Sequence, residues 1–187
     1  MNIVCATDNN YVKYCGIMLA SLFENNSFEH HTVHLLTEGL SADNRRVLEE
    51  FVCSFNAHFC YYELDSSFVS SCPIKETDHL TIATYYRLFI TDILPTNIDK
   101  VLYLDCDIII NRSIQELWNT NLSGYAIAAV EELGASAEDV YERLNYDKKY
   151  GYFNAGVLLI NLAFWREHRM TSLFCNYINI NRSRLKA

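Results

Sequence analysis

Apolar segments alternate between two periodicities along the first 64 residues, and this alternation constrains the fold more than any other feature. Three short apolar runs have the length of buried strands: residues 2–6, 31–37 and 57–64. Between them, apolar side chains recur at helical spacing over residues 11–25 and again after Ser41, a favourable N-cap residue. The second helix is expected to bury Val47, Leu48, Phe51, Val52 and Phe55. Strands that alternate with helices predict an α/β fold, with helices on both faces of a mainly parallel sheet.

The later part of the chain is less regular. We expect helices at residues 81–92, 113–118, 136–144 and 164–180 and strands that begin at residue 100 or cover 125–130 and 157–161. Pro95 follows the first of these helices and is expected to end it. No internal repeat, low-complexity linker or domain boundary is evident, so residues 1–187 are expected to form one domain.

Charge and cysteine content exclude several classes of protein. A formal charge of −8 disfavours nucleic acid as a partner and limits membrane contact to peripheral association. The seven cysteines are odd in number and form no CxxC pair, which favours reduced core thiols in a cytoplasmic protein over zinc ligands. The N-terminus carries no pattern of a signal peptide, and no apolar run is long enough to span a membrane.

Residues 100–110, KVLYLDCDIII, are unusual for a buried strand. An unpaired buried charge is costly, so Asp105 and Asp107 are expected where negative charge is used. If the chain stays extended there, alternate residues point to the same side. Two carboxylates placed in this way can hold Mg²⁺ or Mn²⁺, which then neutralises a diphosphate. A glycine-rich phosphate loop is absent, because Gly16 is the first glycine of the chain.

Four ordered segments together resemble the N-terminal part of the family 8 retaining glycosyltransferases, which include bacterial lipopolysaccharide galactosyl- and glucosyltransferases and the glycogenins. The segments are NIVCATDNNYVKY (2–14), HLTIATYYRLFI (79–90), VLYLDCDIII (101–110) and YFNAGVLLINLAFWREH (152–168). The resemblance implies a GT-A-type α/β fold, C-terminally incomplete in this chain. It also implies metal-dependent transfer of a hexose from UDP-galactose or UDP-glucose to a glycan acceptor, such as a lipopolysaccharide core sugar.

The same resemblance implies roles for individual residues. The uridine would be held by Ala6, Thr7, Asp8, Asn10 and Tyr11, with Leu80 in the base pocket. Mn²⁺ or Mg²⁺ would be bound by Asp105 and Asp107, with Cys106 and Asp105 also close to the donor. The diphosphate and sugar would meet Arg87, Asn154 and the Ala155 backbone, and Glu131 falls where some members have an acidic residue near the sugar.

Several residues also have simpler interpretations. Asp8 and Asn10 can be turn formers, Arg87 a charge on a helix surface, and Asn154 the end of a turn before Gly156. The two aspartates can end a strand beside Arg112, or belong to a haloacid-dehalogenase-like phosphatase whose first aspartate is a nucleophile. Against the phosphatase, Ile109 stands where those enzymes usually have Thr or Val.

A further alternative is a non-catalytic UDP-sugar-binding fragment. In the family, a Gln-containing segment near the sugar and a metal-binding His follow later in the chain. Neither is present before Ala187, so catalysis by this polypeptide alone is an open question at the level of the sequence.

Overall fold

A computed structural model describes residues 1–27, 30–65, 83–133 and 135–185. Its centre is a six-stranded sheet in the order β3-β2-β1-β4-β6-β5. The strands are β1 (Asn2–Ala6), β2 (Thr32–Thr37), β3 (His58–Glu63), β4 (Lys100–Leu104), β5 (Ile127–Glu131) and β6 (Phe153–Asn161). The first four strands pair in parallel, whereas β6 runs antiparallel to both β4 and β5. The sheet is therefore mixed rather than parallel throughout.

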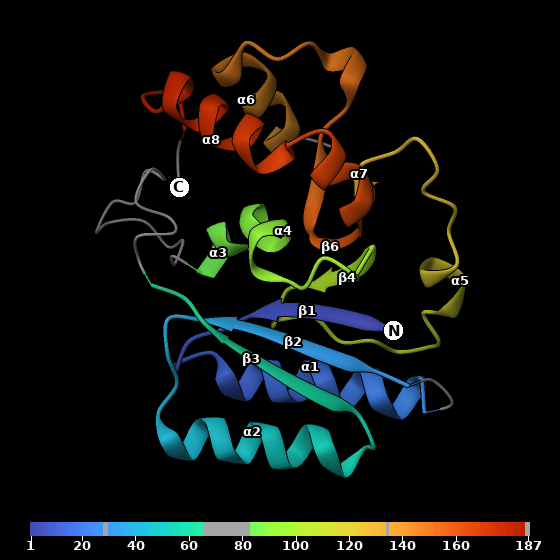
Figure 1. Cartoon of the computed structure of the whole chain (residues 1–187). Coiled ribbons are helices and arrows are strands. Elements are labelled where there is room, and N and C mark those ends of the chain that lie inside the picture. Colours follow the sequence, from blue (N-terminus) through green and yellow to red (C-terminus); the bar gives the residue numbers. More distant parts are fainter. Residues whose placement is uncertain (28–29, 66–82, 134, 186–187) are drawn as a thin grey trace.

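Helices cover both faces of this sheet (Figure 1). One face carries α1 (Val12–Asn25) and α2 (Ala42–Ser54). The other carries α3 (Ala83–Tyr86), the 3-10 turn η2 (Arg87–Phe89), α4 (Ile90–Ile93), α7 (Leu162–Glu167) and α8 (Met170–Asn181). The remaining short elements are α5 (Gln115–Trp118), α6 (Ala135–Leu144) and η3 (Lys148–Tyr150). The predicted α/β class is confirmed, with helices on both sides.

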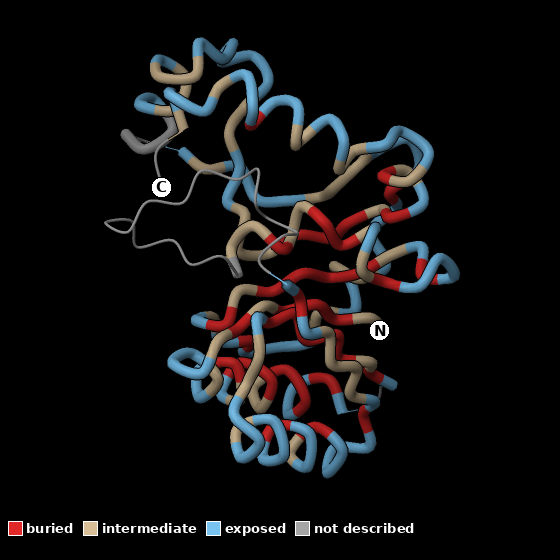
Figure 2. The backbone as a smooth tube through the Cα atoms, turned by 60° about the vertical axis from the view of Figure 1, so that its left-hand side comes forward, coloured by how far each residue is buried: buried red, intermediate tan, exposed pale blue. Residues whose placement is uncertain are grey.

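Side-chain alternation along the strands produces two cores, one on each face. Ile3 and Cys5 of β1 pack in the cluster beneath α1 and α2, whereas Val4 packs in the cluster beneath α3, α4, α7 and α8. Buried residues are concentrated in the central strands and the adjoining helix faces, while the region around α6 is mostly exposed or half-buried (Figure 2). The central strands therefore form a rigid base for the polar residues at their ends.

Most predicted elements occur, but three details were wrong. The predicted helix at 164–180 is broken into α7 and α8, because Arg169 adopts a left-handed conformation with φ of 50°. The predicted helix at 81–92 is interrupted by η2 in its described part. In α2, Ser41 caps the helix by accepting a hydrogen bond from the Asn44 N–H, but Val47 and Phe55 are 56% and 37% exposed rather than buried.

Three of the cysteines form a buried cluster between β1, α1 and the end of β4. The Sγ atoms of Cys5 and Cys15 lie 3.7 Å apart. Contact with Cys106, together with burial, raises the pKa of Cys5 and Cys15 well above 9, so both stay protonated thiols. Cys53 is exposed, contrary to the expectation that it belongs to the core. Within the described parts of the chain, no helix is both long and apolar enough to cross a bilayer.

Candidate functional site

The order of the strands creates a topological switch point between the carboxyl ends of β1 and β4. β1 pairs with β2 on one side and with β4 on the other, so the direction of winding reverses between them. Ligands of open α/β sheets bind at such a switch point. Residues 7–11 follow β1 and residues 105–107 follow β4. Both segments contain residues that the sequence predicted for the site.

The turn after β1 is organised by Asp8. Its Oδ1 atom accepts hydrogen bonds from the backbone N–H groups of Asn10 and Tyr11, each at 2.8 Å. Asp8 therefore acts as a turn former, the simpler of the two roles considered for it. Thr7 is buried and its N–H bonds to Leu36 O at 3.0 Å, whereas Asn10 and Tyr11 are exposed. The exposed edge of this turn is free to meet a ligand, with Asp8 fixing its shape.

Asp105 follows β4 directly, and its Oδ1 atom accepts two hydrogen bonds. Arg87 donates through Nη2 at 3.0 Å and Tyr103 through its hydroxyl at 3.0 Å. Burial raises the pKa of Tyr103 well above 10, so the hydroxyl keeps the proton that it donates. The Asp105 side chain is still 35% exposed, compared with 13% for Arg87. Asp105 is thus held at one oxygen and accessible at the site.

Arg87 is committed to this site through three separate bonds. Besides Asp105, its guanidinium donates to Ala155 O at 2.6 Å and, through Nε, to Thr84 O at 2.9 Å. Its positive charge also lies over the Tyr103 ring, 4.5 Å from the centroid. These contacts exclude the interpretation of Arg87 as a charge on a helix surface. They join η2, β4 and β6 at one place.

The start of β6 lies beside Asp105 because this strand is antiparallel to β4. Asp105 N–H bonds to Gly156 O at 2.8 Å, and Asn154 Oδ1 accepts from Gly156 N–H at 2.8 Å. A Cβ atom at Gly156 would lie 3.0 Å from Asp105 Oδ2 and 3.1 Å from Asn154 Oδ1. Two side-chain oxygens therefore converge on a space that only glycine leaves open.

Asp107 is placed differently from the expectation. β4 ends at Leu104, and Cys106 and Asp107 lie in a turn, so the side-to-side alternation of an extended strand does not apply. Asp107 is exposed, whereas Cys106 points inward and its Sγ contacts Ala6 O at 3.2 Å. Cys106 thus links the ends of β4 and β1 rather than presenting its side chain to a ligand.

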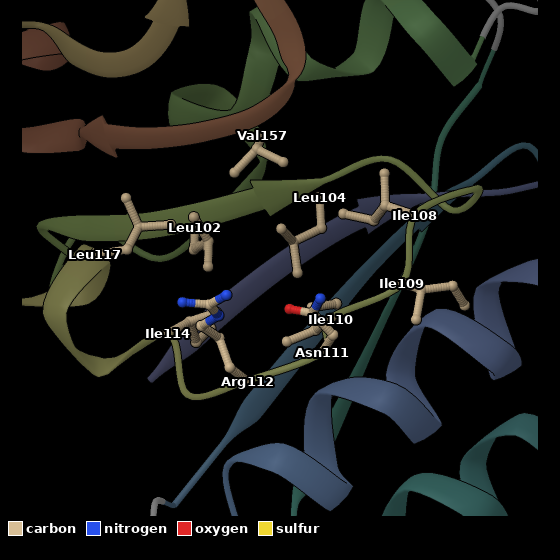
Figure 3. A pocket seen from close by; sticks show the side chains of 10 residues that line it. All are labelled: Leu102, Leu104, Ile108, Ile109, Ile110, Asn111, Arg112, Ile114, Leu117 and Val157. Atoms are coloured by element: carbon tan, nitrogen blue, oxygen red, sulfur yellow. The ribbon is translucent and has the colours of Figure 1, made fainter.

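The three isoleucines after Asp107 lead the chain back toward the core: Ile110 is buried, Ile108 is half-buried and Ile109 is 65% exposed. They lie against a small apolar cavity of about 230 Å³ between β4 and residues 108–114, onto which Leu102, Leu104 and Val157 also project (Figure 3). The Ile110 backbone is tied to α1, because its N–H donates to Ser21 Oγ at 3.0 Å and its O accepts from Asn25 Nδ2 at 2.9 Å. The aspartate turn is therefore anchored on both sides.

One further predicted residue, Glu131, lies apart from this cluster. Glu131 ends β5, where it pairs with Phe153 next to the Val130–Asn154 pair. It lines an open cleft of about 350 Å³ together with Tyr150, Tyr152 and Phe153. The structure brings Glu131 to the strand that carries Asn154, but no hydrogen bond joins it to Asp105 among the described residues. Leu80 lies outside the described residues.

Tyr103, which contacts both Arg87 and Asp105, was not singled out from the sequence. It lies two residues before Asp105, within the VLYLDCD segment. A side-chain role for Tyr103 was hidden because a strand tyrosine looks like core. For metal binding, the described residues provide no group of three His, Cys, Asp or Glu side chains that could hold an ion. A cation at this site would therefore draw only Asp105 and Asp107 from that set.

Comparisons with known proteins identify the family and the fold of this chain. The family model "Glycosyl transferase family 8" matches residues 2–187. General stress protein A of Bacillus subtilis is 31% identical over 181 residues, covering 96% of this chain and 62% of that protein. Lipopolysaccharide 1,3-galactosyltransferase of Salmonella typhimurium is 32% identical over 167 residues, with 88% and 49% covered. The chain thus spans about half to two thirds of the length of these curated relatives.

A solved structure of the galactosyltransferase LgtC, in complex with donor and acceptor sugar analogs, superimposes with a TM-score of 0.90 at 28% identity. That match covers 100% of this chain and 67% of LgtC. The predicted GT-A-type fold is thereby confirmed. Since the family model spans nearly every residue, the chain belongs to glycosyl transferase family 8.

Proposed function

We propose that this chain forms the donor-binding part of a retaining glycosyltransferase, which transfers galactose or glucose from a UDP-sugar to a glycan acceptor. Membership of glycosyl transferase family 8 supports the reaction class, and the lipopolysaccharide galactosyl- and glucosyltransferases among the relatives support the choice of sugar and acceptor. A lipopolysaccharide core sugar is the acceptor class that these names favour.

The observation that carries the proposal is the convergence of Arg87, Asp105, Asn154 and Gly156 at the switch point. Asp105 Oδ2 and Asn154 Oδ1 border the space that the missing Cβ of Gly156 leaves open. A sugar hydroxyl needs such acceptors at close range, and a backbone without a side chain permits its approach. Among the described residues Arg87 uses three of its five N–H groups, and the other two can donate to a diphosphate.

A divalent cation fits this site as a partner of the nucleotide. Asp105 and Asp107 are hard oxygen donors at the site edge, and the space beside Gly156 keeps Asp105 Oδ2 uncovered. With no further protein ligand among the described residues, phosphate oxygens would complete the coordination shell. When bound, Mn²⁺ or Mg²⁺ would supply Lewis-acid stabilisation of the departing diphosphate. Arg87 would add a fixed positive charge beside it and hold Asp105 in place.

A UDP titration of the chain with Mn²⁺, and again with EDTA, tests this proposal. We expect binding only with the metal, and Asp107→Asn should abolish most of it by removing one formal charge without changing size. Asp43→Asn, an equivalent change at an exposed position on α2, is the control and should bind as the unmutated chain does. Equal affinity in EDTA would show that the aspartates do not hold a metal.

A binding-only fragment is the second candidate, because the chain covers only 49–62% of the relatives compared above. Incubation with UDP-galactose or UDP-glucose and Mn²⁺ separates the two. Release of UDP indicates a catalytic chain, whereas binding without UDP release indicates a fragment that holds the donor. Turnover of a phosphate monoester in place of both would support the phosphatase alternative.

A further inference from the structure

Tyr103 contacts both members of the Arg87–Asp105 pair from beneath. It is 2% exposed and is the penultimate residue of β4. Its hydroxyl donates to Asp105 Oδ1 at 3.0 Å, and its ring lies under the Arg87 guanidinium with 4.5 Å between centroid and Cζ. So enclosed a side chain cannot meet a ligand directly. Any effect on ligand binding must pass through the two residues that it holds.

The two carboxylate oxygens of Asp105 have different surroundings. Oδ1 has two donors, Arg87 and Tyr103, whose directions differ because one comes from η2 and the other from β4. Rotation of the carboxylate would break both bonds, so Oδ2 stays directed toward the space beside Gly156. Without the phenolic hydroxyl, the long Arg87 side chain alone among the described side chains would donate to Oδ1 of the carboxylate. The aromatic ring would still support the guanidinium from below.

We propose that Tyr103 is a positioning residue that fixes Asp105 and Arg87 together, so that Asp105 Oδ2 is presented to the bound nucleotide sugar. This inference rests on the proposed function for its consequence in binding, but the positioning itself concerns this chain alone. Groups that orient the ligands of a metal typically change its affinity 10- to 100-fold when they are removed. A single hydroxyl among two donors is expected at the lower end of that range.

The test compares Tyr103→Phe with a matched control. Tyr103→Phe removes one hydroxyl and keeps the ring under Arg87. Tyr62→Phe removes a half-buried phenol that also bonds to a side chain, His34 Nδ1 at 3.1 Å, on the edge strand β3. Both variants lose one side-chain hydrogen bond, and thermal unfolding measures what that loss costs in each. The two variants should differ in the rate of solvent exchange at Arg87 and in the affinity for UDP in the presence of Mn²⁺.

Two measurements on the full chain decide the inference. Solvent exchange of the Arg87 Nη2–H protons, one of which bonds to Asp105 Oδ1, should be faster by ¹⁵N NMR in Tyr103→Phe than in the unmutated chain and unchanged in Tyr62→Phe. Calorimetry with UDP and Mn²⁺ should show affinity about ten-fold weaker for Tyr103→Phe alone. If exchange and affinity both stay at their original values, or if Tyr62→Phe changes them equally, Tyr103 has no positioning role.

Failure of the proposed function is a separate outcome. If the unmutated chain binds no UDP in the presence of Mn²⁺, the proposed function is wrong, but the exchange measurement still applies. Faster Arg87 exchange in Tyr103→Phe alone would then support the positioning role in the unliganded chain. Unchanged exchange would overturn it.

Discussion

The guanidinium of Arg87 and the carboxylate of Asp105 lie 3.0 Å apart although 18 residues separate them in the chain. Both are partly shielded from water, and the same guanidinium also bonds to the backbone of β6 at Ala155. The pair therefore connects three segments around the candidate site. Its geometry determines how several substitutions should behave.

Arg87→Lys is expected to weaken UDP-sugar binding although the charge is kept. A lysine ammonium is a point charge on a flexible stem and cannot reproduce the three directed bonds to Thr84, Asp105 and Ala155. The loss should be about 1–3 kcal/mol, as for a charge-assisted hydrogen bond. Calorimetry with UDP-galactose measures it, and Arg46→Lys on the exposed face of α2 is the control. Equal affinity of Arg87→Lys and the unmutated chain would contradict a role for Arg87 at the site.

Asn154→Ala should lower the affinity for UDP-hexose more than the affinity for UDP. The side chain lies beside Gly156, where a sugar can approach the backbone, and the nucleotide itself needs no such contact. The substitution also removes the acceptor of the Gly156 N–H, so Asn154→Asp is the matched variant that keeps an oxygen there. Equal losses for both ligands would place Asn154 outside the sugar site.

Gly156→Ala should abolish most UDP-sugar binding while the protein stays folded. The new methyl group would lie 3.0 Å from Asp105 Oδ2 and 3.1 Å from Asn154 Oδ1, and both oxygens would have to move. Gly16→Ala is the control: a Cβ there meets nothing within 4 Å, in the interior of α1. It should stabilise the protein by roughly 0.5–1 kcal/mol through helix propensity. Unimpaired binding by Gly156→Ala, measured by calorimetry alongside thermal unfolding, would show that the space is not used.

His34 should make the stability of the fold sensitive to acid. It is 2% exposed on β2, and burial lowers its pKa from 6.5 to about 4. As the pH falls, His34 is therefore protonated in the unfolded chain before it is protonated in the folded chain. Its contribution to the free energy of unfolding is fully present above pH 6.5 and is lost as the pH drops from 6.5 toward 4. At pH 5 this corresponds to about 2 kcal/mol.

Urea denaturation at pH 7.5 and pH 5 measures the effect of His34. Other groups add to the pH dependence of the unmutated chain, so the informative quantity is the difference from His34→Gln. That variant keeps polar atoms near Tyr62 and Asn2, the two partners of the ring, without a titrating group. The same loss of stability in both proteins would show that His34 is not responsible.

The sequence alone determined the first helices and strands and indicated that carboxylates form part of a site. Periodicity identified the first three strands and two helices, because buried faces of strands and helices repeat at 2 and 3.6 residues. The two aspartates after an apolar strand indicated a site, since carboxylates are costly in a core. These are local properties of the chain, and a single segment is enough to reveal them.

Only the tertiary structure decided how these segments meet. The sequence predicted a mainly parallel sheet. If β6 ran parallel to β4, its first residues would lie near the start of β4 and far from the residues that follow β4. Its antiparallel pairing with β4 instead brings Asn154 and Gly156 to Asp105. In the same way, the turn at Cys106 and Asp107 replaces the extended geometry that strand alternation assumes. Strand direction and turn geometry depend on contacts between distant residues, such as Arg87 with Ala155, and no local pattern contains them.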